Sequence, residues 1–351
     1  MLILGIETSC DETSAGVVDG SCRVLANVVA TQIDLHARYG GIVPEVASRQ
    51  HVLDIRPTVL QALAVAGAGW SDIDAIAVTH GPGLAGSLIT GLNLAKGLAA
   101  ATGKPLVGVN HLEGHVAAAW GVTGAYGESE QQVLDGVLDS GSPLMCLIVS
   151  GGHTELVLMR GHGSFEPIGE TRDDAAGEAF DKAARVLGLR YPGGPEVQRV
   201  AEGAPETEPL PRAWLAGSDE FSFSGLKTAV INRARSEGLY PAPETEPDPL
   251  KVAAIARAFQ ESVVDVLVTK TLDAADRHGC GAVVVAGGVA ANRPLRETFA
   301  SRAALPVIIP PVTLCTDNGA MIAISGLKRF LAGRIDGWSL DVEPGLRIGA
   351  A

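Results

Sequence analysis

The chain has 351 residues, which is more than one typical hydrophobic core needs and fits a protein of two lobes. A hydrophobic content of 46%, an aromatic content of only 4% and 43 glycines favour a tightly turned α/β enzyme and exclude disorder for most of the chain. The formal net charge of -13 excludes a protein that coats nucleic acid through its overall field, so local basic surface or a partner would have to supply phosphate contacts.

The first part of the chain predicts a three-stranded meander followed by alternating helices and strands. Buried-strand patterns separated by short polar turns cover residues 2–9, 14–20 and 23–32. The elements expected next are a helix at 44–67, a strand at 74–83, a helix at 87–103, a strand at 105–110 and a helix that begins near Asn110.

The same order then repeats. The expected elements are strands at 143–152, 154–163 and 165–172, helices at 173–189 and about 250–278, a strand at 282–288, a helix from Arg293, a strand at 306–311 and a last helix within 315–333. Two such units predict a duplicated α/β fold with a central cleft between two lobes. The leading hairpins distinguish it from a plain Rossmann fold and are similar to the actin, sugar-kinase and Hsp70-ATPase architecture, which implies a nucleotide cleft but no particular reaction.

We expect residues 1–110 plus about 325–351 to form the first actin-like lobe and residues 111–324 to form the second. Segments rich in Pro, Glu and Gly near 121–142 and 201–249 predict surface insertions or linkers, to which we assign no chemistry.

The five cysteines are scattered and lack CxxC spacing, so we expect neither a disulfide framework nor a thiolate zinc site. No signal-like segment opens the chain, and no apolar run approaches the roughly 20 residues of a membrane span. These features predict a cytoplasmic protein without a membrane association.

Glycine turns follow several expected strands and could bring backbone N–H groups close to an anion. SGGHTE, residues 150–155, is either such a site or a tight hairpin turn. AGGVAANRPLR, residues 286–296, is either an adenosine site at a helix start or an ordinary strand-to-helix turn. Asp181, before a third glycine turn at 191–197, would have to face a cleft to act, because a helix carboxylate is usually solvated.

The stretch NHLEGH places His111 and His115 four residues apart, on one face of the expected helix. Asn110 and Glu113 have the spacing of a capping box, which would start the helix at His111. The two imidazoles either bind a metal or serve as core or cap histidines. Asp317, near the start of the last helix, is a candidate third ligand or an N-cap, and only the fold could bring it to the histidines.

The position of Glu113 argues against a metalloprotease. HExxH and HxxEH motifs place the general base next to a histidine, whereas Glu113 lies two residues from each and is turned about 200° from either around the helix. Its carboxylate would therefore point away from a metal held by both imidazoles.

Seven motifs taken in order resemble the tRNA N6-adenosine threonylcarbamoyltransferase family, TsaD in bacteria, over nearly the whole chain. They are GIETSCDET (5–13), NHLEGH (110–115), VSGGHTEL (149–156), GEAFDKAARVLGL with YPGGP (177–195), FSFSGLKTAV (221–230), GGVAANRPLR (287–296) and CTDNGAMIA (315–323). The resemblance implies transfer of the threonylcarbamoyl group from threonylcarbamoyl-AMP to N6 of adenosine 37 in tRNAs that read codons beginning with A, with a metal ion activating the acyl donor.

Carried over by motif position, the metal ligands are His111, His115 and Asp317, and the resemblance slightly favours iron over zinc as the divalent ion. The implied substrate-binding residues are Ile148, Val149, Ser150, Gly151, Gly152, Asp181, Gly194 and Asn292. Asp11 and Glu12, at the first hairpin turn, are candidates for an electrostatic or proton-handling catalytic role.

The resemblance also implies two protein partners, a paralogue of the same fold and a small ATPase, beside tRNA. The 121–142 segment departs from the family pattern, in which this connection is shorter, and leaves the local tRNA or partner surface open. The alternatives are an actin-like ATPase or kinase, which has no use for HxxxH, and a non-catalytic scaffold paralogue, which should lack the histidine pair and Asp317. The intact trio disfavours both.

Overall fold

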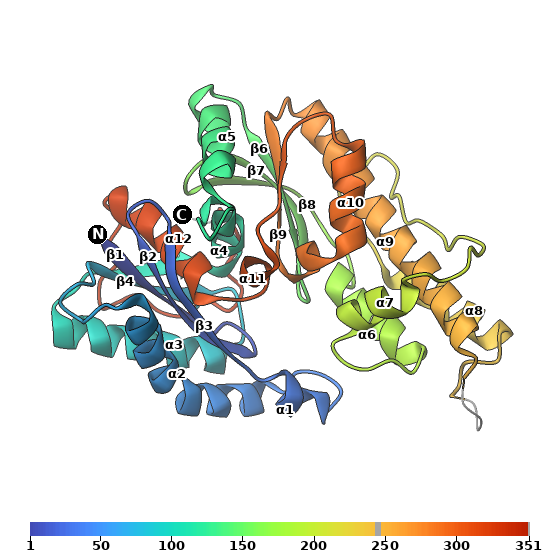
Figure 1. The fold of residues 1–351 in the computed structure, drawn as a ribbon, viewed down its shortest axis with the longest axis horizontal. Helices are drawn as coiled ribbons and strands as arrows, with labels where there is room; N and C mark the ends of the chain where they lie inside the picture. The colour runs from blue at the N-terminus through green and yellow to red at the C-terminus, as the bar shows by residue number, and fades with distance from the viewer. Residues whose placement is uncertain (243–246, 350–351) are drawn as a thin grey trace. The chain divides into compact units, whose positions relative to one another are not determined.

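The computed structural model describes residues 1–242 and 247–349 and contains two five-stranded sheets (Figure 1). The strand order is β3-β2-β1-β4-β5 in the first sheet and β10-β9-β6-β7-β8 in the second. Each sheet therefore has a meander of three consecutive strands at one side and two later strands at the other. This correspondence confirms the predicted duplicated α/β fold.

In the first sheet, three antiparallel strands are followed by two strands parallel to β1. The strands are β1 (Leu2–Glu7), β2 (Glu12–Asp19), β3 (Val24–Thr31), β4 (Ala75–Gly81) and β5 (Leu106–Asn110). Because β1, β4 and β5 are parallel neighbours, their carboxyl ends meet at one edge of the sheet. Binding sites in α/β proteins form at such edges.

The second sheet repeats this arrangement with a parallel trio built on β6. Its strands are β6 (Leu144–Val149), β7 (Thr154–Gly161), β8 (Ser164–Glu170), β9 (Ala282–Ala286) and β10 (Val307–Ile308). All residues of β6 and β9 are buried, as the continuous apolar runs in the sequence predict for parallel strands covered on both faces.

The helices in the first part of the chain and at its end are α1 (Ile33–Ala37), α2 (Pro44–Ala66), α3 (Ala85–Thr102), α4 (His111–Ala117), α5 (Glu128–Asp139), α11 (Val312–Cys315) and α12 (Gly319–Leu331). Those between are α6 (Ala176–Val186), α7 (Gly193–Ala201), α8 (Ser224–Ser236), α9 (Pro249–Arg277) and α10 (Arg293–Arg302). Short 3₁₀ turns follow α4 at Ala118–Trp120 and β9 at Gly288–Ala291. Along the described ranges, no helix combines the length and apolar character that a membrane span requires.

Both segments that were expected to be loose contain a helix in the structure. Residues 128–139 of the 121–142 segment form α5, which buries Leu134. Residues 203–220 contain no helix or strand, in agreement with the prediction, whereas α8 follows where no element was expected. Residues 243–246 of the expected 201–249 segment lie outside the described residues.

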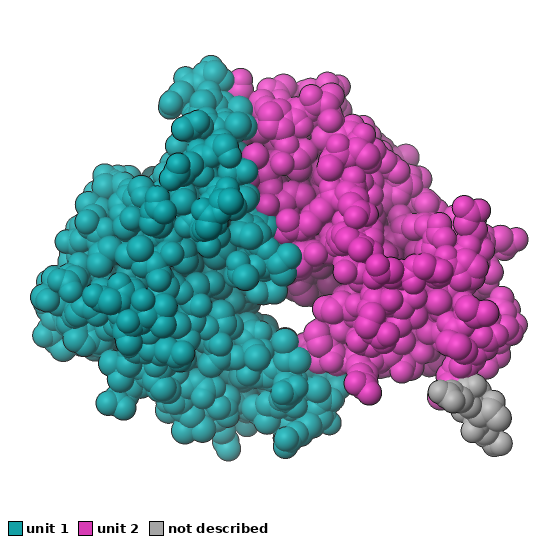
Figure 2. All heavy atoms as spheres, viewed as in Figure 1, with its two compact units in different colours: residues 1–141, 159–166, 310–351 teal, residues 142–158, 167–309 magenta. Residues whose placement is uncertain are grey.

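By packing, the described chain divides into one compact unit of residues 1–141, 159–166 and 310–351 and a second of residues 142–158 and 167–309 (Figure 2). This division places residues 111–141 and the segment that carries Asp317 in the first unit. The lobe boundary expected at residue 110 follows the repeat in the sequence and stays a prediction.

Helix α12 packs directly on the backbone of the first sheet, opposite the face covered by α2 and α3. A Cβ atom added to Gly319 would lie 2.2 Å from the backbone nitrogen of Gly16, and one added to Gly16 would lie 2.3 Å from that of Ala320. The start of α12 is therefore held against β2 without intervening side chains.

We expect Gly319→Ala to lower the free energy of unfolding by about 1–3 kcal/mol, because the added methyl group meets strand backbone that cannot move aside. Urea denaturation measures the effect. The matched control is Gly97→Ala in α3, where an added Cβ meets no described atom within 4 Å, and which should stabilise the helix by roughly 0.8–1 kcal/mol. Equal denaturation midpoints for the two variants would contradict the close approach.

Candidate metal centre

Helix α4 begins at His111, as predicted, because Asn110 caps it. The Asn110 Oδ1 atom accepts hydrogen bonds from the backbone N–H groups of Leu112 (2.9 Å) and Glu113 (3.3 Å). The Glu113 side chain does not complete the capping box and lies instead 3.8 Å from the guanidinium of Arg329. The Glu113 carboxylate therefore faces Arg329, as its position around the helix predicts.

Asp317 lies between α11 and α12 and is not the cap of α12. Asn318 takes that role, since its Oδ1 accepts from the Met321 N–H at 2.9 Å. The alternative interpretation of Asp317 as an N-cap is therefore wrong.

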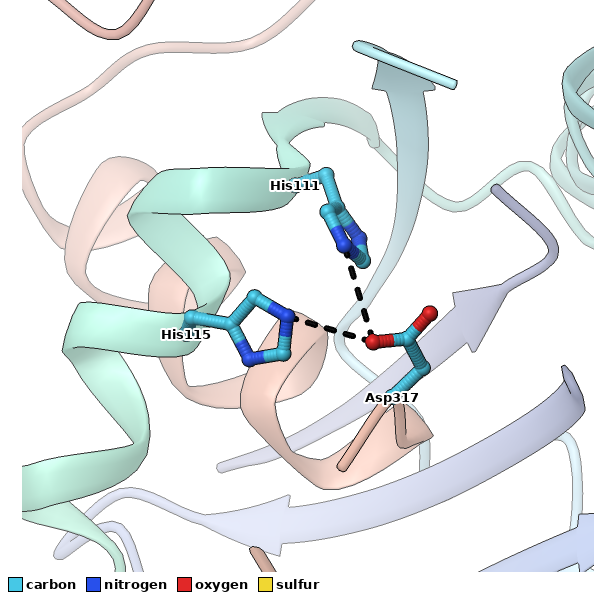
Figure 3. Close-up of side chains that lie close together, drawn as sticks. All are labelled: His111, His115 and Asp317. Carbon is cyan, nitrogen blue, oxygen red and sulfur yellow. Dashed lines mark ion pairs between the residues drawn. The ribbon is translucent and has the colours of Figure 1, made fainter. Parts of the chain in front are cut away.

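Both histidines project from α4 toward the Asp317 carboxylate (Figure 3). Asp317 Oδ1 lies 3.6 Å from Nε2 of His111 and 3.2 Å from Nε2 of His115. One potential ligand atom from each of the three residues lies within 4.8 Å of the others. The structure thus brings together the trio that the sequence alone could not connect.

The trio fits a metal ion by distance and by its unsatisfied atoms. Bonds of about 2.1 Å in tetrahedral or octahedral geometry place neighbouring ligand atoms roughly 3.0–3.4 Å apart, close to the two distances here. The His115 side chain is 0% exposed, and neither ring nitrogen forms a hydrogen bond with any described residue. A buried, unsatisfied imidazole nitrogen is costly unless a ligand compensates it.

Behind His111 lies a buried carboxylate that the sequence analysis did not select. Glu7, the last residue of β1, is 0% exposed, and its Oε2 lies 3.1 Å from His111 Nδ1. Thr79 of β4 donates its hydroxyl to the same oxygen at 2.5 Å, and the Ser9 N–H donates to Oε1. The Ser9 hydroxyl also lies 3.1 Å from His111 Nδ1. With Nδ1 held, Nε2 of His111 is left facing Asp317, the arrangement typical of a metal-binding histidine.

Glu7 and His111 also shift each other's pKa values. Burial by itself lowers the pKa of His111, but the Glu7 and Asp317 carboxylates outweigh it and raise that pKa to about 9. Burial likewise opposes ionisation of Glu7, yet the His111 charge and hydrogen bond hold the Glu7 pKa below its ordinary value. The carboxylates therefore create a site that favours positive charge, either a proton or a metal ion.

Asp11 and Glu12 lie at the start of β2, where the hairpin turn was expected. Burial and the charge of Asp317 raise the pKa of Asp11. Burial raises the pKa of Glu12 to about 8, although Glu12 also accepts a hydrogen bond from the Thr31 hydroxyl at 2.9 Å. At neutral pH the Glu12 carboxyl is mostly protonated, and it ionises as the pH rises through about 8.

In the second unit, the β6–β7 turn lies against the start of α6. Ile148 and Val149 end β6 with 0% exposure, and Ser150 begins the turn. The Ser150 carbonyl accepts from the Gly177 N–H at 3.1 Å. A Cβ added to Gly151 or Gly152 would meet no described atom within 4 Å, so the turn leaves open space over its backbone.

The other predicted substrate-binding residues lie on helices of the same unit. Asp181 in α6 accepts the N–H of Gly193 at 2.7 Å and so fixes the start of α7, where Gly194 again borders open space. Asn292 caps α10 by accepting the Leu295 N–H at 3.0 Å, and its amide donates to Gln260 at 2.9 Å. The structure gives Asp181 and Asn292 positioning contacts within the protein, and their contact with a substrate stays a prediction.

Solved structures with low sequence identity share this fold. The (R)-2-hydroxyglutaryl-CoA dehydratase component A of Acidaminococcus fermentans matches with a TM-score of 0.54 at 14% identity, covering 94% of this chain and 98% of its own. HypF of T. kodakarensis matches with a TM-score of 0.57 at 15% identity, covering 95% of this chain and 48% of its own. Together with the two sheets of matching strand order, these likenesses confirm the expected actin-like fold.

Other proteins are similar to this chain at a much higher sequence identity. A protein named tRNA N6-adenosine threonylcarbamoyltransferase from Dehalococcoides mccartyi is 51% identical over 348 residues, an alignment that covers 99% of this chain and 99% of the relative. A protein of the same name from Bacillus subtilis is 50% identical over 356 residues, which covers 99% of this chain and 96% of the relative. The family model described as TsaD, tRNA N6-adenosine threonylcarbamoyltransferase, matches residues 23–324. The chain therefore belongs to the TsaD family and is an acyltransferase of tRNA threonylcarbamoyladenosine synthesis.

Proposed function

We propose that the chain transfers the threonylcarbamoyl group of threonylcarbamoyl-AMP to N6 of adenosine 37 in tRNAs that read codons beginning with A. The observation that carries this proposal is the convergence of His111, His115 and Asp317 in a chain of this family. A non-catalytic scaffold has no need of a buried imidazole pair facing a carboxylate.

The reaction needs an activated acyl donor, because the exocyclic amine of adenine is a poor nucleophile. In the transfer, N6 forms a bond to the carbonyl carbon, the bond from that carbon to the phosphate oxygen breaks, AMP leaves and N6 loses one proton. An iron or zinc ion held by the three residues would supply a Lewis acid to the threonylcarbamoyl oxygens. Glu7 would keep the His111 ring oriented for that role through its contact with Nδ1.

The β6–β7 turn is suited to the AMP part of the donor. Gly151 and Gly152 would offer backbone N–H groups to the phosphate, beside Ser150 and the buried Ile148 and Val149. The N–H of Ser150 itself donates to the His153 carbonyl at 2.8 Å and shapes the turn. Asp181, Gly194 and Asn292 would bind other parts of the donor, with Asp181 and Asn292 proposed for the ribose or adenine. Gly194 borders open space at the start of α7, Asp181 fixes that start, and Asn292 caps α10 in the same unit.

Asp11 and Glu12 would act near the donor through charge or proton transfer. A Glu12 carboxyl with a pKa of about 8 is suited to exchange a proton near neutral pH. We further propose that the protein works in the cytoplasm with a paralogue of the same fold and a small ATPase, which would help an acidic chain to hold tRNA.

The test combines the purified chain, its two proposed partners, threonylcarbamoyl-AMP and unmodified tRNA, and quantifies nucleosides by mass spectrometry. We expect threonylcarbamoyladenosine to appear at position 37 only when the chain is present. A tRNA whose adenosine 37 is replaced by guanosine serves as the matched control. If the complete mixture yields no modified adenosine, the proposal is wrong.

A further inference from the structure

On the side of α4 away from the histidine pair, the first unit contains a basic recess. Its polar lining includes Glu113, His162, Lys328, Arg329 and Arg334. Lys328 and Arg329 come from the last turn of α12, and Arg334 lies over the β7–β8 turn, 3.0 Å from where a Cβ on Gly163 would be. Segments distant in sequence thus bring three cationic side chains to one cavity.

Few acceptors face the cationic side chains in this recess. Within residues 1–242 and 247–349, no side-chain hydrogen bond is made by Lys328, Arg329 or Arg334, and the Nε atom of Arg329 is buried. The one carboxylate in the lining, Glu113, reaches Arg329 only at 3.8 Å. A buried donor without an acceptor is rare and calls for a water or ligand.

Two nearby carboxylates are already engaged elsewhere. Asp135 accepts the indole N–H of Trp120 at 2.7 Å, and Asp336 accepts the backbone N–H of Gly108 at 2.7 Å. Neither belongs to the lining of the recess. The lining of the recess therefore sets three cationic side chains against one carboxylate, Glu113.

Cations at the end of α12 have a simpler explanation, which covers only part of the observation. Lys and Arg in a last helical turn interact favourably with the helix dipole. That effect explains why positions 328 and 329 are occupied by Lys and Arg. It does not explain why the Nε atom of Arg329 is buried, and it does not apply to Arg334, which lies beyond the helix end.

We propose that the recess binds a phosphate group. Guanidinium groups offer planar pairs of donors that match phosphate oxygens, and a lysine adds a mobile point charge. The phosphate is either a free anion or part of the tRNA backbone. An occupant that binds Arg329 competes with Glu113 for that side chain. Because Glu113, Val116 and Ala117 line the recess, the occupant also contacts α4, the helix that carries both histidines.

The first experiment titrates inorganic phosphate into the purified full-length chain by calorimetry, in chloride buffer at fixed ionic strength. We expect Arg329→Gln to weaken phosphate binding about tenfold or more, since it removes a charged hydrogen bond. Glu113→Gln should strengthen binding severalfold, because it removes the competing carboxylate. The matched control, Arg56→Gln on the exposed surface of α2, should leave binding unchanged.

The second experiment measures binding of unmodified tRNA by the same variants. The recess would be assigned to the tRNA backbone if two results are found together. The unaltered chain would not bind free phosphate, and tRNA affinity would fall with Arg329→Gln but not with Arg56→Gln. If Arg329→Gln does not fold, as judged by circular dichroism, Lys328→Gln replaces it in both experiments. The proposal is overturned if neither phosphate nor tRNA binding depends on these side chains. The phosphate titration involves no transfer chemistry, so its failure is separable from failure of the proposed function.

Discussion

Replacement of both His111 and His115 by alanine is expected to reduce bound metal from stoichiometric to background and to abolish threonylcarbamoyl transfer. Two of the three converging ligands are lost, and one carboxylate cannot retain the ion alone. The fold should persist, because Asn110 still caps α4 and alanine is the best helix former. Elemental analysis of the purified protein measures the metal, and circular dichroism measures the fold.

A histidine outside the trio provides the control for this experiment. His80 in β4 is partly buried and hydrogen bonds to none of the three residues, so His80→Ala should keep the metal. Asp317→Asn should give an intermediate loss, since an amide oxygen is a weaker ligand than a carboxylate. Unchanged metal content in the double histidine variant would show that the ion, if bound, lies elsewhere.

Glu7→Gln is expected to weaken metal binding about 10- to 100-fold, although Glu7 is not itself placed as a ligand. The amide keeps the shape of the side chain but removes the charge that orients His111 and increases its basicity. Competition with a chelator measures the metal dissociation constant, and nitrogen NMR of the imidazole reports which ring nitrogen of His111 carries the proton.

Thr79→Val provides a graded comparison, because it removes only one hydrogen bond from the Glu7 carboxylate. We expect a smaller loss of metal affinity in this variant than in Glu7→Gln. A Glu7→Gln protein with the same metal affinity and the same His111 tautomer as the unaltered chain would rule out the positioning role.

Local sequence patterns predicted the part of the candidate metal centre that lies on one helix. The four-residue spacing of the histidines and the Asn110 cap depend on neighbours along one helix, and both predictions are confirmed. Asp317 is a candidate third ligand from its residue type, but local patterns cannot place it beside the histidines, because the contact joins residues about two hundred positions apart in sequence. Glu7 was missed for the same reason. Its signal, a carboxylate ending an apolar strand, acquires meaning only when β4 and α4 are placed beside it.

The missed helices have similar causes. The composition of residues 121–142 predicts a loop, yet α5 forms, where Leu134 is buried and Asp135 bonds to the Trp120 indole. Helix α8 has no cap of its own, and its first N–H groups are satisfied by Asp173, about fifty residues earlier in the chain. Contacts that stabilise an element from a distance leave no periodic signal within it.

The direct packing of α12 on β1 and β2 has a consequence for biosynthesis. The ribosome makes β1 and α4 early, whereas Asp317 and α12 emerge only after the whole second unit has been synthesised. Until then the sheet backbone at Gly5 and Gly16 has no helix against it, and the two histidines lack their carboxylate. A nascent chain therefore cannot assemble the three-residue centre, and the metal ion that we propose for it would bind only after the last helix has been translated.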